Sequence, residues 1–392
     1  MIKKRNIEYV YITFLLLIWT LYSCYSMFNS EDKGYNILGG FSPLLSVFSF
    51  VISLLYLLVN YVGIFCKKKH GKMLLRWIIY FLYVSLVVLL LSGNANINSI
   101  IYNQVQVMLP MMVMLVMYLY IRRNGITEFF LTTCLCVFFI LVVQYFRLYS
   151  ILNTLIDAHI GGAYYPVFLL PVVLMNNSNK VKLFVIVITF IVLLSSLKRG
   201  GIVAFGLGVL TYLICYNMIS NKQRIKGLFL AVFAIAILIV VFLWMNTYNS
   251  DSIIERFYSI QEDEGSGRID VWKQTWFMIV NSSASNFLFG HGYSAVLRDS
   301  PLFLSAHNDL LEILYDYGFI CLLLFIGVLS SWIRLIQNLY TVKDALFPHL
   351  AMLLVIVVVF MTISHVLIYP WMLWVCLCLG VFMGQIDRNK TI

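Results

Sequence analysis

Long, nearly uninterrupted apolar runs dominate this sequence, and they constrain its fold more than any other feature. Crossing the hydrocarbon core of a bilayer takes about 20 mainly apolar residues, and the chain offers such runs one after another, separated by short polar stretches. Of the 392 residues, 62% are hydrophobic and only 11% are charged, whereas about a quarter of a soluble domain is charged. The sequence therefore predicts a polytopic membrane protein and excludes a soluble globular domain.

The apolar runs predict an all-α fold with about twelve transmembrane helices. The sixth run is short and contains Pro166 and Pro171, and only a tight turn separates the last two. The predicted spans are Ile7–Phe28, Ser42–Phe65, Met73–Leu91, Ile100–Ile121, Thr127–Phe146, Tyr164–Met175 with the residues before it, Val181–Leu197, Gly201–Ile219, Gly227–Tyr248, Asp309–Ile333, Leu346–His365 and Val366–Gln385.

The basic residues predict how these spans are oriented. Short cytoplasmic loops carry an excess of Lys and Arg, and nineteen of the 27 basic residues fall on the side that holds both termini. Both termini are therefore expected in the cytoplasm, and the net charge of +10 is a topology signal rather than a nucleic-acid surface. The other eight fall on the outer side: Lys33, Arg147, Lys198, Arg199, Arg256, Arg268, Lys273 and Arg298.

This layout divides the chain into three predicted segments. Residues 1–245 hold nine spans, 246–308 form one long outer loop, and 309–392 hold three spans and a cytoplasmic C-terminus. Long loops in compact proteins are usually functional or disordered. Apolar residues recur at helical spacing within this loop, which predicts either a helix lying in the membrane interface or a small packed helix. They are Ile269, Trp272, Trp276, Ile279 and Val280.

Lys198 and Arg199 are the most informative charges, because they stand on the outer side between two apolar spans. Gly200 and Gly201 follow them and open the next helix. A helix N-terminus exposes free N–H groups and the positive end of the helix dipole, and Arg presents a fork that suits phosphate oxygens. The pair therefore predicts an anion site; the alternative is that both side chains snorkel to lipid phosphates.

Two further outer arginines are candidates for the same site. Arg268 follows Gly265-Ser266-Gly267, and its alternative role is an ordinary ion pair with Asp270 or with the acidic run 262–264. Arg147 ends the fifth span on the outer face, either as a snorkelling residue or as a third phosphate ligand.

His307 is the candidate proton acceptor. It stands with Asn308 at the end of the outer loop, in the same region as the outer cations. Histidine titrates near neutral pH, and a general base needs a group that orients its ring. Asp309 and Glu312 are close enough in sequence to orient an imidazole.

Metal and cofactor chemistry are not expected. The sequence has no Asp-x-Asp signature, and the acidic run Glu262-Asp263-Glu264 is typical of a solvated loop rather than of a divalent-ion site. The eight cysteines lie in or beside apolar runs without a CxxC spacing, which favours small core hydrophobes over metal ligands or a disulfide framework.

The motifs together resemble the O-antigen ligase and polymerase superfamily. The resemblance covers the chain from Lys198 to about Cys321, and before that only the predicted topology is similar. Two positions depart from it: Lys198 stands where many members have Ser, and Cys321 where the ligase motif has Gly, Thr or Tyr. In order, the motifs are Lys198-Arg199-Gly200-Gly201, Gly267-Arg268-Ile269-Asp270-Val271-Trp272, Phe289-Gly290-His291-Gly292-Tyr293, and His307-Asn308 followed by Gly318.

The resemblance implies a membrane glycosyltransferase with a GT-C-like fold. Members use undecaprenyl-pyrophosphate-linked glycans as donor and acceptor at the periplasmic face of the bacterial inner membrane. By position, Arg199 and Arg268 would hold the pyrophosphate and His307 would be the base. Membrane lipids and a polysaccharide chain-length regulator are the other candidate partners; nucleic acid is not.

The function expected from this resemblance is that of an O-antigen polymerase. It would transfer the growing glycan onto a fresh lipid-linked repeat unit. One alternative is the O-antigen ligase, which passes the glycan to lipid A-core, and Cys321 speaks against it. A polysaccharide flippase is the alternative from another class, but transporters show paired repeats and broken helices, and no internal repeat is visible in this sequence.

Overall fold

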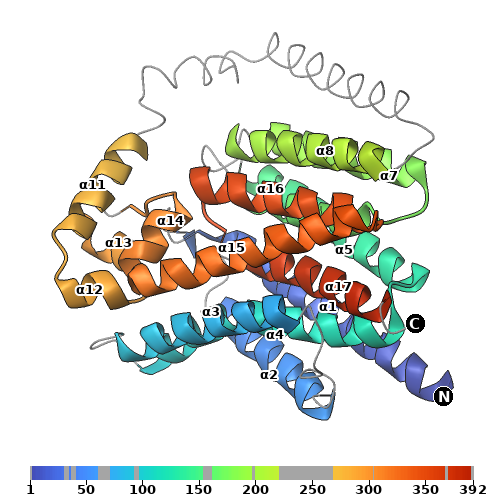
Figure 1. Ribbon diagram of the computed structural model, residues 1–392, viewed down its shortest axis with the longest axis horizontal. Coiled ribbons are helices and arrows are strands. Elements are labelled where there is room, and N and C mark those ends of the chain that lie inside the picture. Colours follow the sequence, from blue (N-terminus) through green and yellow to red (C-terminus); the bar gives the residue numbers. More distant parts are fainter. Residues whose placement is uncertain are drawn as a thin grey trace, which may run out of the picture. The chain divides into compact units, whose positions relative to one another are not determined.

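The computed structural model consists of helices joined mostly by short connections (Figure 1). It describes residues 2–30, 35–36, 41–60, 71–91, 97–152, 161–196, 199–219, 268–302, 304–366 and 370–389. Within these ranges the one strand pairing joins β1 (Asn29–Ser30) to β2 (Tyr35–Asn36). The predicted ninth span and the first part of the predicted outer loop, with Arg256 and the acidic run, lie outside the described residues.

Seven helical segments in the described part of the chain are long and apolar enough to cross a membrane. The prediction of a polytopic α-helical membrane protein is confirmed, while the number twelve is not reached by these length and composition criteria. The seven segments lie in α1 (Ile2–Phe28), α2 (Phe41–Asn60), α3 (Gly71–Leu90), α4 (Ile97–Asn124), α5 (Glu128–Leu152), α8 (Arg199–Ile219) and the helical run Asp309–Thr341.

The chain divides into two compact units that interleave in sequence. The first comprises Met1–Phe81, Asn96–Ser196 and Tyr369–Ile392, and the second comprises Leu82–Ala95 and Leu197–Ile368. All of the predicted site residues except Arg147 belong to the second unit.

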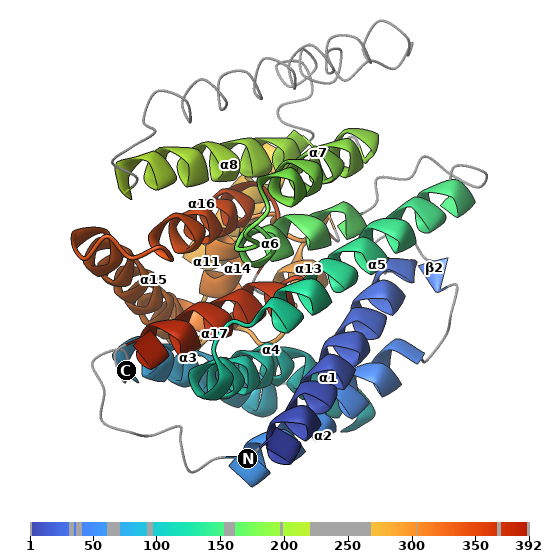
Figure 2. The ribbon, with the colours of Figure 1, turned by 90° about the vertical axis from the view of Figure 1, so that its right-hand side faces the viewer.

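In the first unit, α17 (Met372–Asn389) is the central helix and packs along α4 and α6 (Figure 2). Two glycines allow the close approach, because a Cβ on Gly380 would meet the carbonyl oxygen of Met114 and a Cβ on Gly384 that of Tyr118. Small residues bring membrane helices together in this way. Near the end of α17, the Tyr118 hydroxyl donates a 2.6 Å hydrogen bond to Asp387 Oδ2.

Helix α6 (Tyr164–Val173) corrects the prediction of a sixth span. It has ten residues, too few to cross a bilayer, and every one of them is buried. It packs against α5, α17 and α7 (Asn179–Ser195), and Cys378 of α17 donates to the carbonyl oxygen of Phe168. A short helix at membrane depth is tolerated when protein encloses it, so the prolines that shorten this run are accommodated inside the unit.

In the second unit, α8 packs along α16 (Phe347–Ile363), as Figure 1 shows. Gly208 lies against Ile356. Gly200, at the start of α8, lies against Ile363. The start of α8 therefore meets the end of α16. Helix α15 (Gly318–Thr341) packs on α16 as well.

Four short helices precede α15, and the last of them leads into a π-helix, η4 (Ile313–Tyr317). A π-helical turn inside a helix is frequent at functional sites. The short helices are α11 (Arg268–Val280), α12 (Ala284–Phe289), α13 (Ala295–Asp299) and α14 (Asp309–Glu312).

Gly290 and Gly318 let two backbone segments touch where the π-helix ends. Their φ angles are +90° and +83°, and a Cβ on Gly290 would meet the carbonyl of Asp316, whereas one on Gly318 would meet that of Leu288. Gly292 N donates to Asp316 O at 2.9 Å across the same contact. The glycines of two motifs noted in the sequence therefore have a structural role.

Helix α11 separates the predicted apolar stripe into two faces. Ile279 is buried and the Trp272 indole N–H donates to the carbonyl of Ala306, so this side is a packed face. Trp276 and Val280 lie on the exposed side. The packed-helix interpretation is thus confirmed for one half of the stripe, while the other half is an exposed apolar surface.

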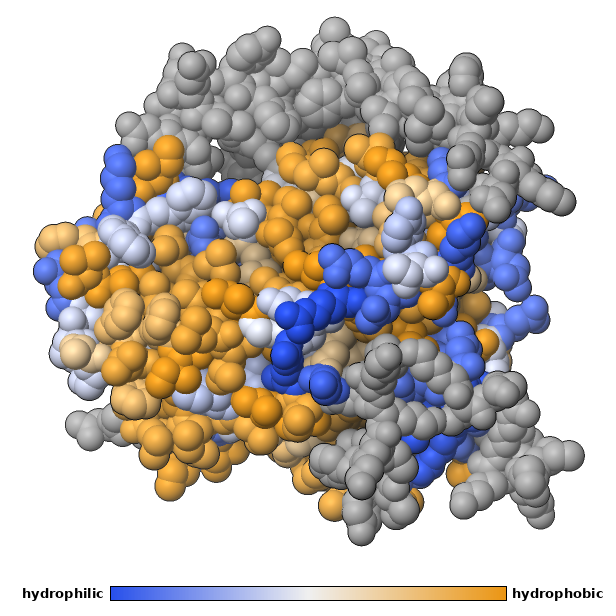
Figure 3. Space-filling model, viewed as in Figure 1, coloured by the Kyte–Doolittle hydropathy of each residue, from blue (hydrophilic) through white to orange (hydrophobic). Residues whose placement is uncertain are grey.

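Exposed apolar side chains are also common on the long helices, as expected of a protein surrounded by lipid. Hydrophobic residues cover much of the face shown in Figure 3. On α15, Leu323, Ile326 and Ile333 are exposed. The cysteines of the described ranges are free thiols, and all except Cys136 are buried.

Candidate active site

His307 stands at the bend of a short loop between α13 and α14. Its φ angle of +50° places it in the left-handed region, which is uncommon for a residue other than glycine and is often found at functional sites. The residue before it, Ala306, is fully buried, while His307 itself is partly exposed. The loop thus exposes part of His307, while the residue before it is held in the interior.

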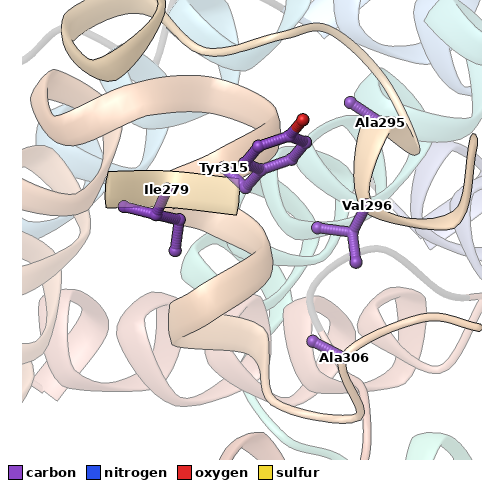
Figure 4. Close-up of a cluster of buried hydrophobic side chains, with 5 residues drawn as sticks. All are labelled: Ile279, Ala295, Val296, Ala306 and Tyr315. Atoms are coloured by element: carbon purple, nitrogen blue, oxygen red, sulfur yellow. The ribbon is translucent and has the colours of Figure 1, made fainter. Parts of the chain in front are cut away.

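A small apolar cluster holds the loop at Ala306, the residue before His307 (Figure 4). Ile279 of α11, Val296 of α13, Tyr315 of η4 and Ala306 are buried together, with Ala295 beside them. Three helices and the loop therefore share one core.

The ring of His365, which follows α16, packs against the ring of His307. The two ring centroids are 4.6 Å apart and the ring planes are inclined by 40°. His365 is 3% exposed, so the pair consists of one accessible ring and one buried ring.

Two carboxylates and a hydroxyl surround the buried ring. His365 Nδ1 lies 3.2 Å from Glu312 Oε2 and 3.9 Å from Asp309 Oδ1, and His365 Nε2 is hydrogen-bonded to Ser305 Oγ at 3.0 Å. We expected Asp309 and Glu312 to orient His307; in the structure both lie against His365. A carboxylate, an imidazole and a hydroxyl in line form the arrangement by which enzymes orient a histidine.

Backbone N–H groups hold the remaining carboxylate oxygens. Glu312 Oε1 accepts from Ala306 N at 2.7 Å, and Asp309 Oδ2 accepts from Val366 N at 2.8 Å. Both carboxylates are therefore tied to the residues that neighbour the two histidines. Burying a charge is costly unless it is paired and hydrogen-bonded, and these contacts meet that requirement.

The same three side chains are the group best placed to hold a metal ion in the part of the chain that the structure describes. One ligand atom each from Asp309, Glu312 and His365 lies within 4.8 Å of the others. The 3.2 Å separation between His365 Nδ1 and Glu312 Oε2 also suits an ion pair between a protonated ring and a carboxylate.

Asn308 has a structural task beside the candidate base. Its side-chain oxygen accepts hydrogen bonds from Leu310 N and Leu311 N, which caps the N-terminus of α14. An Asn cap satisfies helix N–H groups that would otherwise lack partners. The His307-Asn308 pair thus places a histidine immediately before a capped helix.

Helix α11 brings Arg268 toward the same loop. Trp272 donates its indole N–H to Ala306 O at 2.7 Å, directly before His307 in sequence. Arg268 lies one turn earlier on the same side of α11 and is partly exposed. Two predicted motifs, one around Arg268 and one at His307, therefore meet in the second unit.

Arg199 begins α8, and its backbone lies at the same end of α16 as the histidine pair. The neighbouring Gly200 packs on Ile363, two residues before His365. The side chain of Arg199 and the whole of Lys198 lie outside the described residues. Arg147 is an exposed residue of α5 in the first unit.

Sequence reasoning missed His365 and Ser305. His365 ends an apolar run and lies 58 positions after His307, so no local pattern links the two. One signal was available, since an ionisable residue at the edge of a membrane span requires a partner or a function. Applied to His365, that rule points to the carboxylates of Asp309 and Glu312.

The fold and site together define an α-helical membrane protein with a buried histidine and carboxylate group beside an accessible histidine. Residues 184–326 match the family described as O-antigen ligase, which confirms the resemblance to the O-antigen ligase and polymerase superfamily. The matched segment includes Arg199, Arg268 and His307, while His365 lies after it. A search of curated proteins finds no match to this chain.

The family match supports a function of the O-antigen ligase or polymerase type, and with it a glycosyltransferase-like membrane enzyme.

Proposed function

We propose that this protein is an O-antigen or related polysaccharide polymerase. It transfers a growing glycan from undecaprenyl pyrophosphate to a sugar hydroxyl of a new lipid-linked repeat unit at the periplasmic face of the inner membrane. The observation that carries the proposal is the hydrogen bond from Trp272 to Ala306, which joins the helix that begins at Arg268 to the residue before His307.

The proposed transfer requires two contributions from the protein. A lipid pyrophosphate is a good leaving group, so the protein must stabilise the negative charge that grows on it and accept a proton from the acceptor hydroxyl. Arg199 and Arg268 supply the first function by positioned positive charge, with Lys198 and Arg147 as further candidate cations. His307 supplies the second as general base, since its ring is the more accessible of the pair.

Substitutions test these roles. Arg199→Ala, Arg268→Ala and His307→Ala should each abolish chain growth with normal expression and membrane insertion, and full-length polymer in all three variants would overturn the proposal. Arg199→Lys should rescue only in part, because Lys cannot make the bidentate contact with phosphate.

A strain lacking this protein distinguishes polymerase from ligase. Lipopolysaccharide is separated on a gel, together with the lipid-linked glycan pool. A single repeat unit on lipid A-core indicates that the missing activity is the polymerase; polymer that accumulates on its lipid carrier without attachment indicates the ligase.

The proposed reaction uses no metal ion. Transfer by the purified protein should therefore be unchanged by a strong chelator, measured as the rate of polymer formation before and after treatment. Loss of activity that returns with a divalent cation would instead assign the carboxylates around His365 to a metal.

A further inference from the structure

We propose that His365 is a positioning residue for His307: Glu312, Asp309 and Ser305 fix the buried ring, and that ring fixes the accessible one. The inference rests on the proposed function, in which His307 takes the proton of the acceptor hydroxyl. It adds a residue that lies after the matched family segment.

Contacts at both ring nitrogens hold His365 in one orientation. Polar partners lie on both sides of its ring: Glu312 Oε2 is 3.2 Å from Nδ1, and Ser305 Oγ is hydrogen-bonded to Nε2 at 3.0 Å. A carboxylate oxygen beside Nδ1 favours the tautomer that carries hydrogen on Nδ1, and in that tautomer Nε2 accepts from the Ser305 hydroxyl. The carboxylate thereby selects one tautomer.

The same groups also fix the loop on both sides of His307. Ser305 and Ala306, which precede it, contact His365 and Glu312 respectively. Asp309, which follows it, bonds to Val366 N. Ser305 and Asp309 thus tie the two sides of the bend at His307, with its positive φ angle, to one short segment, residues 365–366.

The rings of His307 and His365 are in direct contact. His307 lies 4.6 Å from His365 between ring centroids, a separation within the range of packed aromatic pairs. The accessible ring therefore packs on a buried ring that has polar partners at both nitrogens. A base must lie within hydrogen-bond reach of the proton it takes, and a misplacement of about 1 Å costs up to about 100-fold in rate.

Turnover of a lipid-pyrophosphate-linked repeat unit by the purified full-length protein gives the first test. His365→Ala should lower kcat about 10- to 100-fold with little change in KM, and Phe, which restores a ring without hydrogen bonds, should rescue less than Gln, which restores hydrogen bonds. His349→Gln is the matched control, because His349 is a buried histidine of α16 that packs on Tyr212 outside this network. It should behave as the unsubstituted protein.

A double-variant cycle decides whether His365 acts through His307. The cycle is read from the slow residual sugar transfer that remains in His307→Ala over long incubations; if His365 acts through His307, adding His365→Ala should not slow this residual transfer further. Equal and independent losses would overturn the proposal, as would turnover of His365→Ala within twofold of the unsubstituted protein. Glu312→Gln, which keeps the shape of the side chain, provides the same test if the alanine variant does not fold.

Chemical modification separates this proposal from the proposed reaction. Diethyl pyrocarbonate modifies accessible neutral imidazoles, and its rate at His307 can be followed by peptide mass spectrometry without turnover. Removing His365 should raise the rate at His307 several-fold, and His349→Gln should leave it unchanged. An unchanged rate in His365→Ala would overturn the positioning role, whereas a raised rate in a protein that shows no transfer would retain it and reject the proposed reaction.

Discussion

The two compact units fill their interiors in opposite ways. Between α4 and α17 the first unit packs apolar side chains around two glycines, and its polar pair Tyr118 and Asp387 lies toward the end of the helix. The second unit places two carboxylates and a histidine, all less than 5% exposed, beside its candidate base. Close packing explains the first interior; the second calls for a further reason.

A further reason is needed because burying charge is costly. An apolar interior is stabilised by its own burial, whereas replacing a buried ion pair with apolar residues is often neutral or stabilising. Asp309, Glu312 and His365 therefore contribute something other than stability. Their contacts fix the backbone on both sides of His307, which is what a catalytic loop needs.

The largest effects are expected where backbones touch, in both units. Gly318→Ala places a Cβ against a carbonyl at a φ angle that suits only glycine, so it should lower the free energy of unfolding by at least about 2 kcal/mol. Gly380→Ala should disturb the contact of α17 with α4 in the same way. Gly327→Ala is the control, since no atom lies within 4 Å of the added Cβ. Thermal unfolding in detergent measures all three, and equal midpoints would refute the close-approach role.

Two conservative carboxylate changes sharpen the contrast between the interiors. Glu312→Gln should lower turnover about tenfold or more, because the orientation of His365 depends on it. Asp387→Asn should leave turnover unchanged and lower the free energy of unfolding by about 1 kcal/mol, because its partner is the Tyr118 hydroxyl. The opposite pattern, with turnover lost only in Asp387→Asn, would contradict the distinction drawn between the two units.

A smaller effect is expected at His291, a third histidine of the second unit. Partial burial lowers the pKa of His291 below its ordinary value, and Arg298 adds to this while Asp299 opposes it. As the pH falls through about 6.5, the unfolded chain takes up a proton that the folded ring resists, so the folded state loses stability. His291→Gln does not titrate, so its unfolding midpoint should drop less than that of the unsubstituted protein between pH 8 and pH 5. Equal drops would show that protonation of His291 does not contribute to the loss of stability in acid.

Much of the fold followed from the apolar runs, because a membrane span is a local property of the sequence. The described helices begin and end close to the predicted limits, for example α3 at Gly71–Leu90 and α8 at Arg199–Ile219. The short helix α6 could not be predicted as such, since its length depends on the neighbours that enclose it. A run of apolar residues does not reveal whether lipid or protein surrounds it.

The candidate site was predictable only where its chemistry is contiguous. His307 and Arg268 stand in recognisable local motifs, and α11 was expected from its periodicity. The assignment of Asp309 and Glu312 to His307 followed sequence distance, whereas the fold brings His365 to them across α15 and α16. Pairings between distant segments arise from tertiary packing, which a single sequence does not specify.

We propose that the His307 site transfers a glycan from a lipid pyrophosphate. The most direct measurement reconstitutes the purified protein in liposomes with a synthetic undecaprenyl-pyrophosphate-linked repeat unit and follows the length of the product on a gel. We expect a ladder of polymer for the unsubstituted protein and for His349→Gln, and no ladder for His307→Ala. A ladder of equal intensity from His307→Ala, or no product from the unsubstituted protein, would contradict it.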